Sequence, residues 1–334
     1  MFKKILKILL PKPVVKRIKY LMGWVVAYSH FAYDKKKYIE FSGTYSFDKK
    51  EKLLAVIIAH YHVLEKGLSM VERRTGFGQD VAINLIKLLR RYDLGGYGCN
   101  CRQYLVAVGV LEKYKQFHDD MDFFLNIPED DLRWLSTVRP DCPVDVGDKI
   151  ISKAEIFETT SASFDRFVKS RYSVRNFSGH PVHLDDLYDA IRIAQKSPSA
   201  CNRQSSKVYM VSNKEMLGKV MQLQTGNRGF GHLADKVLVV TSDLQAFHGI
   251  NERNQAYIDG GIFSMSVLYA LHFKQSAACA LNWAVLKEQD VLLHSLLGIP
   301  ECEEIIMLIA VGHFPDEFRV ACSPRKILDE VVIN

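Results

Sequence analysis

The chain has 334 residues, more than the roughly 250–300 at which one hydrophobic core usually stops growing, so we expect two domains. Its 48% hydrophobic and 25% charged residues are typical of a folded protein and exclude a disordered one. No stretch reaches the ~18–20 consecutive apolar residues that a membrane-spanning helix needs. Residues 1–40 hold ten Lys and Arg against two acidic residues, while the whole chain carries only +6. The remainder is therefore nearly neutral, which argues against a general nucleic-acid binder.

The cysteines and the start of the chain indicate a reducing location. The seven cysteines are odd in number and scattered in position, which argues against a disulfide scaffold. Cys99 and Cys101 have no second pair to complete a four-ligand zinc site, so no metal site is predicted. Pro11 and Pro13 follow only a short apolar stretch, which makes a poor secretory signal. We therefore expect a cytoplasmic protein.

Residues 1–40 form a predicted basic, amphipathic arm. Three lysines within the first seven residues share one side of a helix, and Pro11 and Pro13 are expected to break that helix. Further basic residues and then aromatic residues follow over 16–24. Two alternatives remain open. The apolar side chains pack on the protein's own helical domain, or residues 1–24 contact an anionic membrane peripherally, at its inner face.

The next part of the chain is predicted to be a helical domain over residues 41–148. Residues 48–125 are mostly helical in character, because apolar side chains recur every three or four residues, for example within 80–92. Prolines and polar residues then gather over 126–148, which predicts a linker. A second domain is expected over residues 155–334.

Short strands and helices alternate in this second domain. An amphipathic helix ends near Ala194, and a longer helix over 257–273 is apolar nearly all round. The expected strands are 207–211, 236–241 and 305–311. This alternation indicates an α/β or α+β sandwich. No glycine-rich phosphate loop follows any strand, so a bound nucleotide would need its phosphate held another way.

Three polar segments of the second half carry groups suited to a nucleotide. Arg171–Phe177 places two guanidinium groups and a hydroxyl within five residues, and guanidinium forks bind phosphate well. Ser197–Gln204 (Ser-Pro-Ser-Ala-Cys-Asn-Arg-Gln) is a loop of small residues and amides that can closely approach a flat heteroaromatic ring. Cys322–Lys326 again combines serine with arginine. Each segment by itself is typical of a surface loop.

In this order, the three segments together resemble the nitroreductase family of flavoproteins. The resemblance covers about 164–333 and includes the long apolar helix, the short strand 276–281 and the endings Gly298–Glu301 and Ile309–His313. It implies an α+β fold, a nitroreductase-like α/β sandwich in which helices flank a central, mostly antiparallel sheet. It also implies FMN bound at the interface of a homodimer, with electrons transferred by a ping-pong mechanism.

The resemblance assigns the phosphate end of the FMN to two of these segments. Arg171, Ser173 and Arg175 are expected to hold the phosphate and the ribityl chain. Arg325 would complete the phosphate clamp, with Ser323 beside it. This agrees with the chemistry of an ionised phosphate, which is best bound by two or more arginines.

The ring end of the FMN is assigned in the same way. The Pro198–Asn202 loop would reach the flavin from the other subunit, and Asn227 would meet the pyrimidine edge. The stretch Ala278–Leu281 would turn its backbone N–H groups toward the reactive ring nitrogen. The residues that the resemblance places around the flavin are Arg171, Tyr172, Ser173, Arg175, Pro198, Ser199, Ala200, Asn202, Asn227, Cys279, Ala280, Leu281, Ser323 and Arg325.

The chain departs from the family pattern on the substrate side. Glycines that many members carry are replaced by Gln275–Ala278, and Ser205–Ser206 stands where a Pro-Trp pair is frequent. The N-terminal half has no counterpart in the minimal family pattern, so the substrate class does not carry over. Its polar helix end, His62–Leu68, is expected either to make packing contacts and a salt link or to line a pocket above the flavin.

The resemblance implies an NAD(P)H-dependent flavin oxidoreductase that passes electrons to a small organic acceptor. No catalytic side chain is required, because flavin N5 carries the hydride. Two alternatives stay open: an FMN-binding protein without turnover, in a sensor or assembly role, and a flavin dehydrogenase in a biosynthetic pathway such as surface polysaccharide synthesis. We expect a homodimer, because a helix as apolar as 257–273 is seldom buried by one domain. No nucleic-acid partner is expected.

Overall fold

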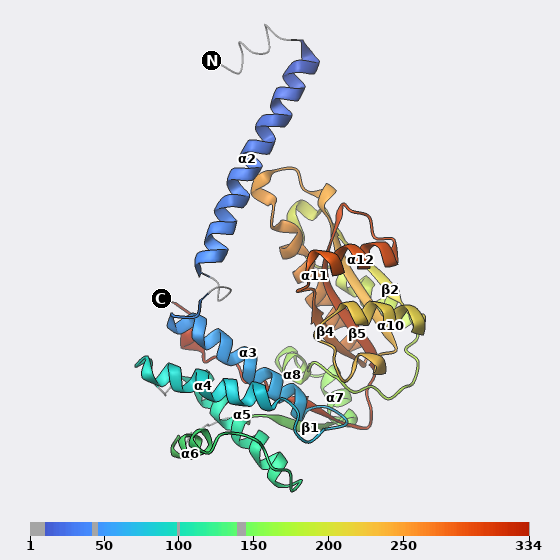
Figure 1. Cartoon of the computed structure of the whole chain (residues 1–334). Helices are drawn as coiled ribbons and strands as arrows, with labels where there is room; N and C mark the ends of the chain where they lie inside the picture. Colours follow the sequence, from blue (N-terminus) through green and yellow to red (C-terminus); the bar gives the residue numbers. More distant parts are fainter. Residues whose placement is uncertain (1–10, 42–45, 99–100, 139–144, 334) are drawn as a thin grey trace.

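The computed structural model describes residues 11–41, 46–98, 101–138 and 145–333. A helical cluster lies at one end of the molecule and a sheet flanked by helices at the other, while one long helix stands out from both (Figure 1). The hydrophobic core follows this arrangement. One buried cluster draws all its members from between Phe47 and Val146, and two others belong to the sheet part. The predicted domain limits at 41, 148 and 155 stay a prediction.

The helical cluster confirms the helical prediction for residues 48–125. In its first helix, side chains at every third or fourth position form the buried face: Leu53, Ile57, Tyr61 and Leu64. Its helices are α3 (Lys50–Leu68), α4 (Gln79–Leu94), α5 (Arg102–Asp119) and α6 (Glu129–Thr137). The last of these lies inside the predicted linker, so that prediction is wrong there. Leu135 of α6 is buried, and Asp131 lies 2.7 Å from Arg90 of α4, which together hold the helix on the cluster.

The sheet part is an α+β sandwich, as predicted. Its four strands pair antiparallel in the order β2-β3-β5-β4, and the helices α9 and α11 cover one face while α10 and α12 cover the other. Successive side chains of a strand point to opposite faces, so both faces of β3 are apolar and covered. Val237 and Val239 face α10 and α12, while Leu238 and Val240 face α9 and α11. The elements are α9 (Leu184–Ala194), β2 (Ser206–Val211), α10 (Lys214–Leu223), β3 (Lys236–Asp243), α11 (Gln255–Phe273), β4 (Ser276–Asn282), α12 (Lys287–Leu297) and β5 (Glu303–His313).

A two-stranded sheet that the sequence did not predict links the two parts. Strand β1 (Asp148–Ser152) pairs antiparallel with β6 (Glu317–Ala321), and the helices α7 (Lys153–Thr160) and α8 (Phe164–Ser170) follow β1. The pairing continues beyond the strands, because the N–H of Cys322 donates to the carbonyl of Gly147 at 3.0 Å. The chain after β6 therefore runs back to α3, where the C-terminus lies in Figure 1.

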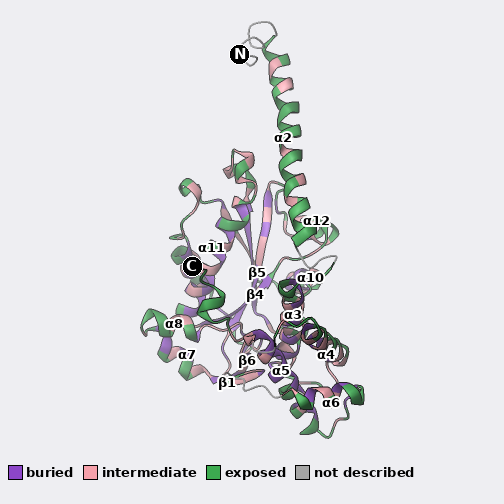
Figure 2. Ribbon diagram, turned by 90° about the vertical axis from the view of Figure 1, so that its left-hand side faces the viewer, coloured by how far each residue is buried: buried purple, intermediate pink, exposed green. Residues whose placement is uncertain are grey.

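The predicted arm is a single exposed helix, α2 (Lys12–Phe41), over its described residues. Pro13 lies in the first turn of α2, where the missing N–H would have no partner in any case. The preceding helix that Pro11 and Pro13 are expected to break lies outside the described residues, so that expectation stays a prediction. No residue of α2 is buried, as Figure 2 shows, so this described part of the arm does not bury its apolar side chains on the helical cluster. Asp34 accepts a hydrogen bond from Arg253 at 2.7 Å. The lysines predicted to share one side of a helix near the start of the chain lie outside the described residues.

Neither α2 nor any other helix in the described ranges combines the length and the apolar character that crossing a bilayer requires.

His272 couples the stability of the sheet part to pH. It is buried at the end of α11, its Nε2 lies 2.8 Å from Ser170 Oγ, and its ring packs against Phe167. Burial and the nearby Arg171 guanidinium lower the pKa of His272 to about 4. Since the unfolded pKa is about 6.5, only the unfolded chain binds this proton between those values. The resulting stabilisation is complete above pH 6.5 and is lost as the pH falls toward 4.

We expect the wild-type protein to lose about 2 kcal/mol of unfolding free energy from His272 between pH 7.5 and 5. His272→Gln keeps a polar partner for Ser170 but does not titrate, so its loss over the same range should be smaller. His180→Gln, at an exposed position, is the matched control and should behave like wild type. Denaturant unfolding at both pH values measures the difference. Equal losses in wild type and His272→Gln would contradict this assignment.

Candidate functional site

A cavity of about 920 Å³ lies where the helical cluster meets the sheet part. Small-molecule sites typically measure roughly 300–1,000 Å³. Its walls come from α3, α5, β1, the end of α8, α11 and the chain after β6. The lining residues are Ile58, Tyr61, His62, Glu65, Gln103, Lys149, Val168, Lys169, Arg171, Tyr172, Ser173, Arg175, Met265, Tyr269, Ala321, Cys322, Ser323, Pro324, Arg325 and Lys326.

The predicted phosphate-binding residues come together here. Arg171, Tyr172, Ser173 and Arg175 line the cavity from one side, and Ser323 and Arg325, about 150 residues further along the chain, line it from another. The first group stands on the extended chain that follows α8. This chain is fixed on the sheet, because the N–H of Val174 donates to the carbonyl of Ala278 in β4 at 3.0 Å.

A close approach further along fixes the same segment on β5. The ring of Phe177 lies so near Gly312 that a Cβ at Gly312 would be 2.6 Å from it. Only glycine leaves room for this contact without a shift of one of the two. The segment therefore has a fixed path, which places its arginines at the cavity.

The cavity has an excess of positive charge. Six basic side chains line it (Lys149, Lys169, Arg171, Arg175, Arg325 and Lys326), against the single carboxylate of Glu65. In the described part of the chain, no carboxylate lies within 4.0 Å of the Arg171, Arg175 or Arg325 guanidinium. Arg175 is only 8% exposed, and burial lowers the pKa of Arg171. Charged groups in such positions are costly without a counter-ion, so the cavity is suited to an anion.

The helical cluster supplies a wall that the sequence predicted in part. His62 and Glu65 line the cavity, and His62 Nδ1 lies 3.2 Å from Glu65 Oε2, as expected for a link within this helix end. That the cavity lies above a flavin stays a prediction. Tyr61 and Gln103 were not anticipated. They are dispersed over two helices, and their only sequence signal is polarity on an otherwise apolar face.

The Pro198–Asn202 loop lies away from this cavity in the single chain. Pro198 and Ser199 line a separate hollow of about 90 Å³ beside Asp259. Cys201, Asn202 and Gln204 in and after the loop have positive φ angles of 52°, 55° and 49°. Such non-glycine residues are strained and persist only where their surroundings hold them.

Two acidic residues hold this loop. Asp259 Oδ2 accepts from the N–H of Ala200 at 3.0 Å, and Glu252 pairs with both terminal nitrogens of Arg203 at 2.9 and 2.6 Å. The Arg203 hydrogen bonds lower the pKa of Glu252 to about 2, so this pair stays ionised under ordinary conditions. A loop strained and tied down in this way is typical of a functional site.

The remaining predicted residues are not among those lining the cavity. Asn227 Nδ2 donates to the carbonyls of Met221 and Gln224 at 2.7 and 2.6 Å, so its amide closes a local turn. Cys279 and Leu281 are buried in the core on β4, and Ala280 packs partly buried on the opposite face of that strand. Burial raises the pKa of the Cys279 thiol, as expected for a packing residue rather than a nucleophile.

Residues 168–224 match the model of the Nitroreductase family. This segment is similar to the Nitroreductase family, and it is a minority of the chain. It contains Arg171 and Arg175, which follow α8, and the strained Pro198–Asn202 loop. The helical cluster and the chain after β6 lie outside the match.

The chain is similar over part of its length to several known proteins. The Bacillus subtilis (strain 168) protein "Putative NAD(P)H nitroreductase MhqN" is 33% identical over 87 residues, which are 26% of this chain and 42% of that relative. The chain therefore spans less than half of its length. The iodotyrosine deiodinase of Nematostella vectensis is 24% identical over 208 residues, 55% of this chain and 79% of that protein. Among solved structures, the FMN-dependent nitroreductase of Clostridium difficile R20291 has 19% identity and a TM-score of 0.41, covering 50% of this chain and 92% of that one.

Proposed function

We propose that the chain is an FMN-dependent oxidoreductase of the cytoplasm that takes electrons from NAD(P)H and passes them to a small organic acceptor by a ping-pong mechanism. The observation that carries the proposal is the set of arginines that line the cavity and have no carboxylate partner in the described part of the chain. Two of them lie inside the segment that matches the Nitroreductase family. A phosphate monoester supplies the missing negative charge. Guanidinium groups bind it through charge-assisted, paired hydrogen bonds.

The residues fit FMN by their chemistry. Arg171 and Arg325 would donate to the phosphate, and the Ser173 hydroxyl would add a hydrogen bond on the same wall. When bound, the flavin supplies hydride transfer at N5. Arg175 and the nearby Lys66, whose pKa is lowered by burial and by Arg175 itself, add two further positive charges on this side. These charges favour any negative charge that develops on the ligand.

The colour of the purified protein tests the function. We expect it to be yellow from bound FMN, and to bleach when NADH or NADPH is added without air. Readmitted air or an organic acceptor should restore the colour. A yellow protein that neither nucleotide bleaches would favour the alternatives, an FMN-binding protein without turnover or a flavin dehydrogenase with another reductant. A protein without affinity for FMN would refute the proposal.

Removing either half of the phosphate clamp should weaken FMN binding. Arg171→Ala and Arg325→Ala each remove a charge-assisted contact, so each should cost about 1.5–3 kcal/mol of FMN affinity. Arg166→Ala, on the exposed side of α8 where it pairs with Glu158, is the control and should bind as wild type does. Flavin fluorescence titration measures all three. Wild-type affinity in both clamp variants would show that the phosphate lies elsewhere.

We propose further that two copies assemble through α11 and complete each other's sites. Apolar side chains remain exposed on this helix: Tyr257, Ile258, Ile262 and Phe273. The Pro198–Asn202 loop lies outside the cavity of its own chain, and a second copy would let it reach the flavin of its neighbour. One dimer interface thus accounts for both features.

An obligate dimer of this kind should bury more than ~2,000 Å². Light scattering at low micromolar concentration should therefore show a dimer for the wild type, and Ile258→Glu should shift it toward monomer with loss of flavin. Lys287→Glu, on α12, serves as the surface control. A flavin-loaded wild-type monomer would contradict the assembly.

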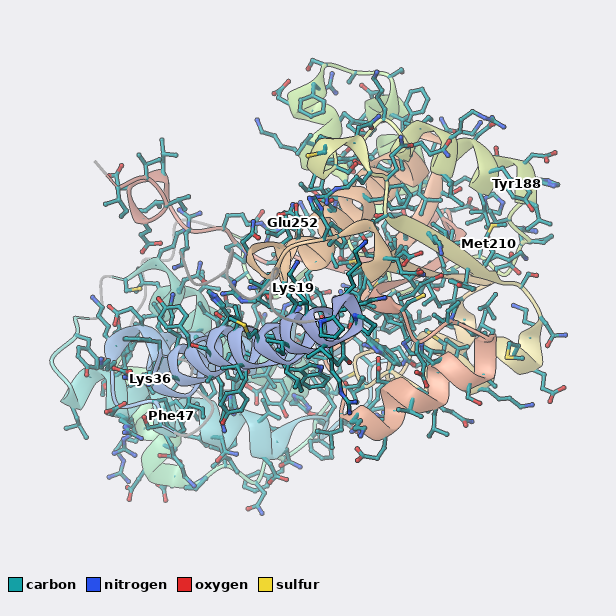
Figure 3. All side chains as sticks on the ribbon, turned by 90° about the horizontal axis from the view of Figure 1, so that it is seen from above. Lys19, Lys36, Phe47, Tyr188, Met210 and Glu252 are labelled. Carbon is teal, nitrogen blue, oxygen red and sulfur yellow. The ribbon has the colours of Figure 1, made fainter. Side chains whose placement is uncertain are left out.

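We also propose that the arm, through residues 1–24 and so through the first half of α2, contacts an anionic membrane surface peripherally, at the inner face. Tyr20, Trp24, Phe31 and Tyr38 recur on one side of this exposed helix, and basic residues flank them. Figure 3 shows α2 from above, with its side chains projecting outward and Lys19 and Lys36 along its length. Aromatic and basic side chains together suit a membrane interface, where each Lys or Arg contributes ~1 kcal/mol.

Vesicle co-sedimentation tests this contact. The protein should bind anionic but not neutral vesicles, and both high salt and deletion of residues 1–24 should abolish binding. If neither the full-length protein nor the deletion variant binds vesicles, and the deletion dissociates the dimer, α2 serves assembly and does not contact a membrane.

A further inference from the structure

A fully buried carboxylate on the helical cluster holds the chain that carries Arg325. Glu65 of α3 is 0% exposed, and its Oε1 accepts from the backbone N–H of Ser323 at 3.2 Å. Its Oε2 faces the hydroxyl of the same serine at 3.5 Å and His62 Nδ1 at 3.2 Å. The acceptor positions of Glu65 are thus turned to protein donors. A carboxylate whose oxygens are engaged in this way restrains the groups that donate to it.

The residue that Glu65 holds has an unusual backbone. Ser323 has a φ of +44°, in the left-handed region that non-glycine residues adopt only when the surroundings impose it. Its carbonyl accepts from Arg325 Nη1 at 2.6 Å. The two polar groups of this serine backbone therefore connect Glu65 on one side to the Arg325 guanidinium on the other.

A second anchor acts on the next residue. Gln103 of α5 is buried, and its Nε2 donates to the carbonyl of Pro324 at 3.4 Å, while its Oε1 accepts from the Tyr61 hydroxyl. Two helices of the cluster thus hold two successive residues of the chain after β6. Both anchors lie beside the cavity that Arg325 lines.

We propose that Glu65, together with Gln103, is a positioning residue for the phosphate site: it fixes the Ser323–Arg325 turn so that the Arg325 guanidinium faces the cavity. This rests on the proposed FMN function and deepens it. It assigns the helical cluster, which lies outside the Nitroreductase-family match, a part in binding the cofactor's phosphate. The N–H and the hydroxyl of Ser323, which the resemblance places beside Arg325, both face Glu65.

A positioning role and a simple packing role of Glu65 differ in which part of the ligand they affect. A packing role would change the affinities for FMN and for riboflavin alike, because the two differ only in the phosphate. A positioning role for Arg325 changes only the FMN affinity. The ratio of the two dissociation constants therefore isolates the phosphate contribution.

The test compares Glu65→Ala, Glu65→Gln and the control Glu51→Ala, an exposed glutamate of the same helix. Glu65→Ala should reduce the FMN-over-riboflavin preference about tenfold, as expected for a lost hydrogen bond to a charged group. Glu65→Gln keeps a carbonyl acceptor for the Ser323 N–H and should recover most of the preference. Glu51→Ala should match wild type. If Glu65→Ala does not fold, Gln103→Leu removes the other anchor and should show the same selective loss.

Hydrogen–deuterium exchange on the flavin-free proteins reports on the anchor without the cofactor. Peptides covering 321–326 should exchange faster in Glu65→Ala than in wild type, while peptides from α4 stay unchanged. Unchanged exchange in 321–326, or an unchanged FMN-over-riboflavin ratio in a folded variant, would overturn the proposal. A wild-type protein that prefers neither flavin would instead refute the proposed function and the phosphate role with it.

Discussion

The site depends on holding several positive charges together, since none of the arginines Arg171, Arg175 and Arg325 has a carboxylate within 4.0 Å among the described residues. Arg171 and Arg175 are fixed by the hydrogen bond that ties their segment to β4, and Arg325 by the turn at Ser323. Side chains of like charge repel one another and lose solvation when buried, so this arrangement persists only where the backbone is restrained. The surroundings supply such restraints: the contact at Gly312, a left-handed serine and a buried carboxylate.

Both parts of the chain contribute walls to the same cavity. The sheet part carries Arg171 and Arg175, which follow α8. Strand β6 pairs with β1, and the chain after β6 places Arg325 on another wall of the cavity. The helical cluster contacts the chain after β6 through hydrogen bonds of Glu65 and Gln103. The Ser323–Glu65 hydrogen bond joins positions 258 residues apart, so folding of the cluster and formation of the cavity are coupled.

Local pattern predicted most of the elements and failed where tertiary contacts decide. The strands and α11 follow from runs of apolar residues with short, clear limits, and α3 from spacing of three and four. The helix α6 was missed because prolines on both sides resemble a linker, while its stability comes from Leu135 and the Asp131–Arg90 pair.

By itself, the sequence determined the sandwich and the arginine and serine motifs that line the cavity, because these lie in short segments whose residue types carry the information. The antiparallel sheet was expected only from the family resemblance. The tertiary structure alone decided the β1–β6 pairing and the part played by Glu65, Gln103 and Tyr61. It also showed that Asn227 closes a turn and that the Pro198–Asn202 loop lies outside its own chain's cavity. The reason is physical: a buried carboxylate is recognisable as an anchor only once its donor, far away in sequence, has been folded against it.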